Sequence, residues 1–78
     1  MNKISKYASF SAIVVRETKM GCILSLDLGD GEYAPAYTYG GFSVGDTVWV
    51  TILKSFADDR YPVACVDTVL NYASESAA

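Results

Sequence analysis

The segment 44–54 constrains what this chain can fold into more than any other. It opens with Gly45-Asp46, a pair typical of a turn, and continues with side chains that alternate between two faces. Successive side chains of a strand point to opposite sides, so this alternation predicts a strand with one buried face. We therefore expect a central strand here, with its tryptophan at least partly exposed. The expected core face is uniformly β-branched and the opposite face is mixed: Val48, Val50 and Ile52 against Thr47, Trp49 and Thr51.

Four further strands are expected around this one. Valine, isoleucine, threonine and tyrosine are frequent, and these residues favour strands over helices. The runs that contain them are separated by glycine, proline or charged residues, which are typical of turns and loops. Pro35 cannot donate a ladder hydrogen bond, so its strand should lie at an edge or be broken there. The expected strands span residues 10–15, 20–26, 32–39 and 61–70, with turns at 16–19 and 27–31 and a loop at 54–59.

Length and composition fit one all-β domain. The chain has 78 residues, of which 51% are hydrophobic, enough for one small core. Five short strands in so small a domain favour a closed antiparallel barrel, because closure removes exposed strand edges. Either a five-stranded oligonucleotide-binding (OB) fold or, as the alternative, an SH3-like barrel would satisfy this. We expect residues 1–8 and 71–78 to fray. The expected core consists of Val14, Leu24, Val48, Val50, Ile52 and alternate residues of 63–66.

Charge and residue content disfavour several classes of function. Six Lys and Arg against nine Asp and Glu give a net charge of -3, which disfavours a strong sequence-independent grip on phosphate backbones. Histidine is absent, and it is the most common general base and metal ligand. We expect no enzyme, no cofactor and no metal site, because the sequence offers no nucleophile–base pair or metal-ligand cluster.

The cysteines and the apolar runs bear on the compartment. Cys22 and Cys65 are far apart and each lies inside an apolar run, so we expect both to be buried free thiols. No apolar stretch has the length of a signal-peptide core or of a membrane span. We therefore expect a small acidic cytoplasmic protein that makes no use of a membrane.

Two segments of the chain resemble a family of RNA-binding domains. Residues 44–50, Val-Gly-Asp-Thr-Val-Trp-Val, followed by Ile52-Leu53, are similar to the Val-Gly-Asp-x-Val-x-Val-x-Val-Leu strand of the ribosomal S-one type domain. Residues 20–24, Met-Gly-Cys-Ile-Leu, look like that family's aromatic-Gly-Ala-Phe-Val segment. Residues 31–33 stand where the family usually has Gly-x-Glu-Gly. The resemblance covers about residues 12–66 and implies an OB fold that binds single-stranded RNA.

The resemblance also implies where a nucleic-acid strand would lie. Met20 and Ile23 occupy positions that are usually aromatic in the family, and Ala36 or Tyr37 stands in place of its histidine. Bases would stack on tyrosines of the third strand or lie on the second, while loop cations would meet phosphates. Single-stranded nucleic acid, RNA rather than DNA, is therefore the first partner expected. The residues expected at this interface are Lys19, Met20, Ile23, Tyr37, Tyr39, Lys54 and Arg60.

A protein-interaction module is the second hypothesis. Tryptophan is enriched among the residues that dominate protein interfaces, and Trp49 is expected on the outer face of its strand. The acidic balance and the high tyrosine content are also compatible with an adaptor, subunit or inhibitor. In that case Trp49 and Tyr33 are the expected contacts, and the sequence leaves the oligomeric state open.

Overall fold

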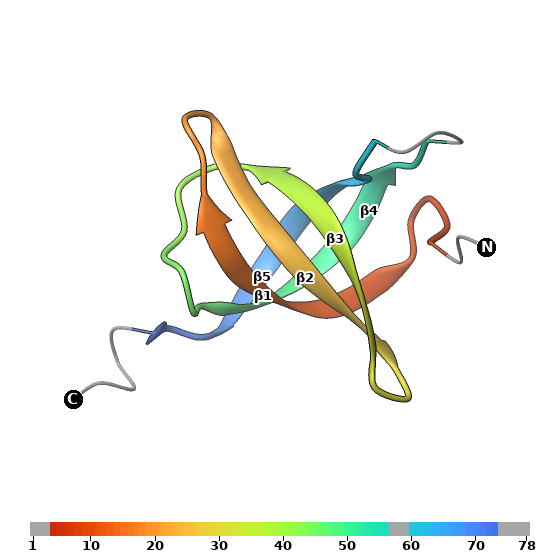
Figure 1. The fold of residues 1–78 in the computed structure, drawn as a ribbon, viewed down its shortest axis with the longest axis horizontal. Helices are drawn as coiled ribbons and strands as arrows, with labels where there is room; N and C mark the ends of the chain where they lie inside the picture. The colour runs from red at the N-terminus through yellow and green to blue at the C-terminus, as the bar shows by residue number, and fades with distance from the viewer. Residues whose placement is uncertain (1–3, 57–59, 74–78) are drawn as a thin grey trace.

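The computed structural model describes residues 4–56 and 60–73. Residues 57–59 of the loop expected at 54–59 lie outside these residues. Five strands form in the part of the chain described, and they wrap into a barrel (Figure 1). Their bounds are Ser9–Glu17 for β1, Gly21–Gly29 for β2, Glu32–Tyr39 for β3, Thr47–Lys54 for β4 and Val63–Asn71 for β5.

The barrel closes in the order β1-β2-β3-β5-β4, with β1 paired to both β2 and β4. This confirms the small, closed, five-stranded all-β barrel of the OB-like type. One expected detail is wrong, because the pairing is not antiparallel throughout. β3 and β5 run parallel and pair only at Tyr37 and Val63. An odd number of strands cannot alternate in direction around a closed ring, so at least one neighbouring pair must be parallel.

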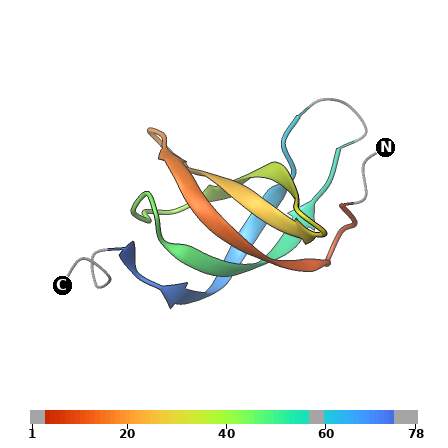
Figure 2. The same ribbon diagram turned by 60° about the horizontal axis from the view of Figure 1, so that its bottom comes forward.

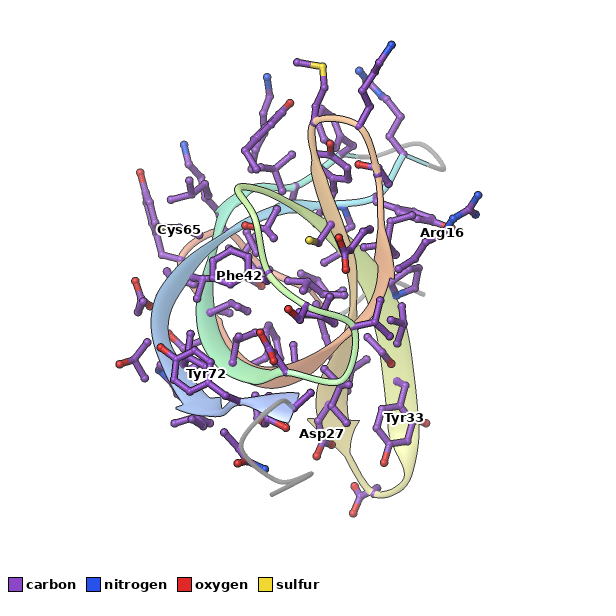
Figure 3. All side chains as sticks on the ribbon, turned by 90° about the vertical axis from the view of Figure 1, so that its left-hand side faces the viewer. Arg16, Asp27, Tyr33, Phe42, Cys65 and Tyr72 are labelled. Atoms are coloured by element: carbon purple, nitrogen blue, oxygen red, sulfur yellow. The ribbon has the colours of Figure 1, made fainter. Side chains whose placement is uncertain are left out.

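The core consists of the inward-facing residues of all five strands. The residues predicted for it on β1, β2 and β4 are buried, and so is Ala64 of the last strand, whereas Val66 is only partly buried and packs against the core. Phe42, in the connection between β3 and β4, also packs on the core and lies across one opening of the barrel (Figure 3). The buried hydrophobic residues are Ile4, Ala12, Val14, Cys22, Leu24, Leu26, Ala36, Val48, Val50, Ile52 and Ala64.

The Gly45-Asp46 turn ties three segments together at this end of the barrel. Gly45 has φ +98, and its amide donates to the Val14 carbonyl. The buried Asp46 carboxylate accepts hydrogen bonds from the backbone amides of Ser43 and Ala73, at 3.1 and 2.8 Å. The motif therefore fixes the β3–β4 connection and the chain just after β5 to β1.

More residues at each end of the domain are attached to the barrel than expected. Ile4 is buried, and the Ser55 hydroxyl donates to its carbonyl. The Tyr7 amide donates to the Ile52 carbonyl, and the Ile52 amide donates to the carbonyl of Ala8. Residues 4–8 and 71–73, which were expected to fray, are thus attached to the barrel in the structure, where Asn71 belongs to β5 and the Ala73 amide donates to Asp46. Backbone hydrogen bonds and one buried isoleucine hold these segments.

Two local expectations are also corrected. β2 continues through Asp27 and Leu28, since Leu28 packs against the core, so the turn is confined to residues around Asp30. Cys22 is buried as expected, but Cys65 is exposed. Cys65 pairs with Thr51, whose side chain belongs to the outer face of β4. The described residues form no helix with the length and apolar character needed to cross a membrane.

Candidate functional site

The outer face of the β2–β3 hairpin carries three tyrosines, two of which are exposed. Inward residues of β2 are buried in the core, so the alternate positions point outward. The partners opposite them on β3 are three tyrosines and a proline. Tyr33 is 63% exposed and Tyr39 is 64% exposed, while Tyr37 is half-buried. The outward pairs across the two strands are Gly21–Tyr39, Ile23–Tyr37, Ser25–Pro35 and Asp27–Tyr33.

A β-bulge in β1 adds a cation to this face. Val14 pairs with Leu24, but Arg16 pairs with Ile23, so β1 has one extra residue at Val15. Arg16, Ile23 and Tyr37 therefore form one outward row across three strands. Figure 3 shows Arg16 and Tyr33 projecting from the same side of the barrel. The sequence analysis had placed Arg16 in a turn and did not include it in the site.

A shallow hollow lies on the same face. Its volume is about 370 Å³, and its walls are largely apolar. Tyr61 reaches it from the β4–β5 connection, and Ser25, Tyr33 and Tyr61 are the lining residues with hydroxyl groups. A planar aromatic ring suits such a surface, because apolar walls and tyrosine rings favour stacking over hydrogen bonding. The lining residues are Val15, Ile23, Leu24, Ser25, Tyr33, Ala34, Pro35 and Tyr61.

Tyr37 connects the loops on either side of this face. Its hydroxyl shares a 3.2 Å hydrogen bond with the hydroxyl of Thr18 in the β1–β2 connection. Its amide donates to the Pro62 carbonyl, 2.8 Å away, at the end of the β4–β5 connection. Its ring meets the Tyr39 ring edge to face, with centroids 5.1 Å apart. Tyr37 is therefore held in place by three contacts, and it presents a preorganised aromatic edge.

Close approach of the backbones places the β1–β2 connection against Tyr37. A Cβ added at Gly21 would lie 2.0 Å from the carbonyl oxygen of Thr38 and 3.0 Å from the Tyr37 hydroxyl. The Gly21 amide also donates to the Thr18 hydroxyl. Gly21 therefore leaves room for the β3 backbone at Thr38, which any larger side chain at this position would displace.

Charges are distributed unevenly along the face. The predicted Lys19 and Met20 are exposed in the β1–β2 connection, and Lys54 and Arg60 flank the β4–β5 connection. The end of the hairpin at the β2–β3 turn instead carries three acids, Asp27 on β2, Asp30 in the turn and Glu32 on β3. In Figure 3 Asp27 lies beside Tyr33, away from Arg16. An anionic strand would therefore favour the Arg16 end of the hairpin over the turn.

The two residues expected at a protein interface do not lie together. Trp49 is 41% exposed, which confirms its predicted partial exposure, and it lies on β4 between Ser11 and Thr68 of the neighbouring strands. Tyr33 instead lies opposite Asp27 on the β2–β3 face. The structure thus separates a Trp49 surface from the β2–β3 face, and Tyr33 belongs to the latter.

The sequence analysis missed several residues of this site. Pro35 shares the parity of the three tyrosines, and that parity was visible in the sequence. Arg16 and Val15 were hidden by the bulge, which no glycine or proline marks. Tyr61 was placed in a strand, but it lies before β5 and lines the hollow from the loop side.

Comparison of this chain with protein-family models, with curated proteins and with solved structures found no match. The case for a function therefore rests on the residues and geometry described above.

Proposed function

We propose that this chain is a non-catalytic binding module for single-stranded nucleic acid, with RNA preferred over DNA, and that the strand lies across the β2–β3 face. One observation carries the proposal: Tyr37, Ile23 and Arg16 form an outward row beside a tyrosine-lined hollow. In OB folds the second and third strands and the loops beside them are the surface that binds oligonucleotides. The segments that resemble the S-one type domain favour RNA.

The interactions available on this face suit the unpaired bases of a single strand better than the base pairs of a duplex. Tyr37 and Tyr39 offer ring edges and faces, and the hollow offers a third aromatic contact at Tyr61. Stacking on each aromatic contributes about 1–3 kcal/mol. Three contacts at about 2 kcal/mol each correspond to a dissociation constant in the tens of micromolar.

Phosphate contacts would add a salt-dependent share of the binding free energy. Arg16 adjoins the aromatic row, and Lys19 lies in the connection that Tyr37 contacts through Thr18. The whole chain has a net charge of -3, so this share is small and depends on local placement of cations. The affinity falls as salt rises, and each phosphate contact steepens this fall, making the slope of log K against log salt more negative by about 0.7 for a single strand.

Fluorescence anisotropy with labelled oligouridine tests the proposal. Tyr37→Ala should weaken binding about fivefold or more, because one stacking contact is lost. Arg16→Gln, an exposed change, should reduce the salt slope by about 0.7. Trp49→Phe is the matched control on the opposite surface and should leave affinity unchanged. Wild-type protein that binds neither RNA nor DNA oligomers at low salt would refute the proposal.

A protein-interaction role is the second candidate, and the Trp49 surface favours it. Trp49 is partly exposed on a β4 face whose neighbours are serine and threonine. Such a ring, flanked by small polar side chains, is available to a partner surface. Trp49→Ala should then shift the sedimentation mass of the purified protein or weaken capture of a defined partner, and should leave oligonucleotide affinity intact.

A further inference from the structure

A second group of paired cations and aromatic rings lies at the end of the barrel where the chain enters. The Lys6 ammonium lies 5.1 Å from the Tyr7 ring centroid. The Lys54 ammonium and the Arg60 guanidinium lie 5.3 and 4.1 Å from the ring centroid of Phe56. Three of the five cations in the described residues are therefore placed over aromatic rings, the combination from which single-strand binding tracks are built.

Backbone contacts make this group continuous with the β4–β5 connection. The Tyr7 amide donates to the Ile52 carbonyl, and the Ser55 hydroxyl donates to the Ile4 carbonyl, so residues 4–8 lie along the end of β4. Figure 2 shows residues 4–8 beside the end of β4, on the side of the barrel away from the end of β5.

The same connection also reaches the β2–β3 face. Its residue Tyr61 lines the hollow there, next to Arg60, whose guanidinium covers Phe56. Aromatic and basic side chains thus follow one another from the hollow to the N-terminal segment, all of them exposed except the partly buried Phe56. The order along this path is Tyr61, Arg60, Phe56, Lys54, Tyr7 and Lys6.

Tyr7 has a backbone conformation that its burial does not explain. Its φ is +70, in the left-handed region that side chains other than glycine and asparagine rarely adopt. Within residues 4–56 and 60–73 the other non-glycine residue with a positive φ is Asp30, which lies in the turn between Gly29 and Gly31, where aspartate is well tolerated. The Tyr7 side chain is 68% exposed, so core packing does not favour tyrosine at this position. Residues held in such a conformation concentrate at functional sites.

We propose that a nucleic-acid strand bound on the β2–β3 face continues past Tyr61, Arg60 and Phe56 and ends on Lys6 and Tyr7. One base stacks on the Tyr7 ring, and the Lys6 ammonium meets a neighbouring phosphate. This inference rests on the proposed function. It extends the site to Lys6 and Tyr7, which lie outside the β2–β3 face and its loops. It predicts that affinity depends on strand length, because short strands fill only the β2–β3 face.

The test compares oligouridines of about four and about ten nucleotides, lengths that span the range for a single OB fold. Tyr7→Asn removes the ring, and asparagine accepts the left-handed conformation, so the fold is retained. For wild type, the longer strand should bind more tightly than the shorter one. Tyr7→Asn should weaken binding of the longer strand about fivefold or more and leave the shorter strand unchanged. Lys6→Gln should lower the salt slope for the longer strand by about 0.7.

The possible results separate the two proposals. If Tyr7→Asn and Lys6→Gln bind the longer strand as wild type does, the extension is wrong and the β2–β3 face remains the site. If wild type binds neither length at low salt, the proposed function fails and this inference fails with it. Trp49→Phe serves as the control on the surface outside the path, and circular dichroism of each variant confirms that it is folded.

Discussion

Replacing Gly21 by alanine tests how closely the second and third strands must approach. A Cβ at this position would lie 2.0 Å from the Thr38 carbonyl oxygen and 3.0 Å from its carbonyl carbon. The obstacle is backbone rather than a flexible side chain, so β2 and β3 must separate by about 1.4 Å or more at this point to restore ordinary contact. Overpacking of this kind costs about 1–3 kcal/mol, and occasionally more. We expect a loss of about 3 kcal/mol, since both strands are also held by their barrel neighbours.

That loss is large for a domain of this size. A chain of 78 residues has a free energy of unfolding of about 4–12 kcal/mol. Gly41→Ala is the matched control, because a Cβ at Gly41 meets nothing within 4 Å and that backbone is compatible with alanine. Its unfolding free energy should stay within about 1 kcal/mol of wild type or rise slightly. Urea unfolding followed by Trp49 fluorescence measures both variants. A Gly21→Ala variant within 1 kcal/mol of its control would refute the described packing.

Three further changes test other parts of the account. Val50→Ala should cost about 2 kcal/mol or more in urea unfolding, because Val50 is fully buried; a loss of a few tenths would mean that β4 faces the other way. Asp46→Ala should lower the free energy of unfolding by about 3 kcal/mol, because its carboxylate accepts two backbone hydrogen bonds. Hydrogen exchange should then speed up at the donor amides of Ser43 and Ala73, and unchanged exchange would contradict the described turn. In native protein a thiol reagent should modify Cys65 quickly and Cys22 only after unfolding, because one is exposed and the other buried; equal rates would contradict the register of β5.

The sequence predicted the strands whose two faces differ. In the segment 44–54 the alternation is strict, and every residue assigned to its core face is buried. The same reasoning worked for β2 because Cys22, Leu24 and Leu26 share one parity. Where one face is buried, a shift by one residue would expose the whole apolar set, so the pattern alone determines the orientation.

The sequence could not predict features that depend on local breaks in register. The bulge at Val15 turns Arg16 toward the β2–β3 face. The sequence placed Arg16 in a turn, because it begins the charged run 16–19 that follows the apolar strand. Cys65 lies in a run that is apolar on both faces, so its exposure depends on the pairing with Thr51. The N-terminal segment joined the barrel through backbone hydrogen bonds to β4, which residue types do not reveal.

An NMR titration of labelled protein with oligouridine tests the central claim most directly, because it locates the contact as well as detecting it. We expect amide shifts at Arg16, Ile23, Ser25, Tyr37 and Tyr61, which share the β2–β3 face and its hollow. The Trp49 indole resonance should stay in place. Shifts that cluster around Trp49, or no shifts at millimolar oligonucleotide, would contradict the claim that this face binds a single strand.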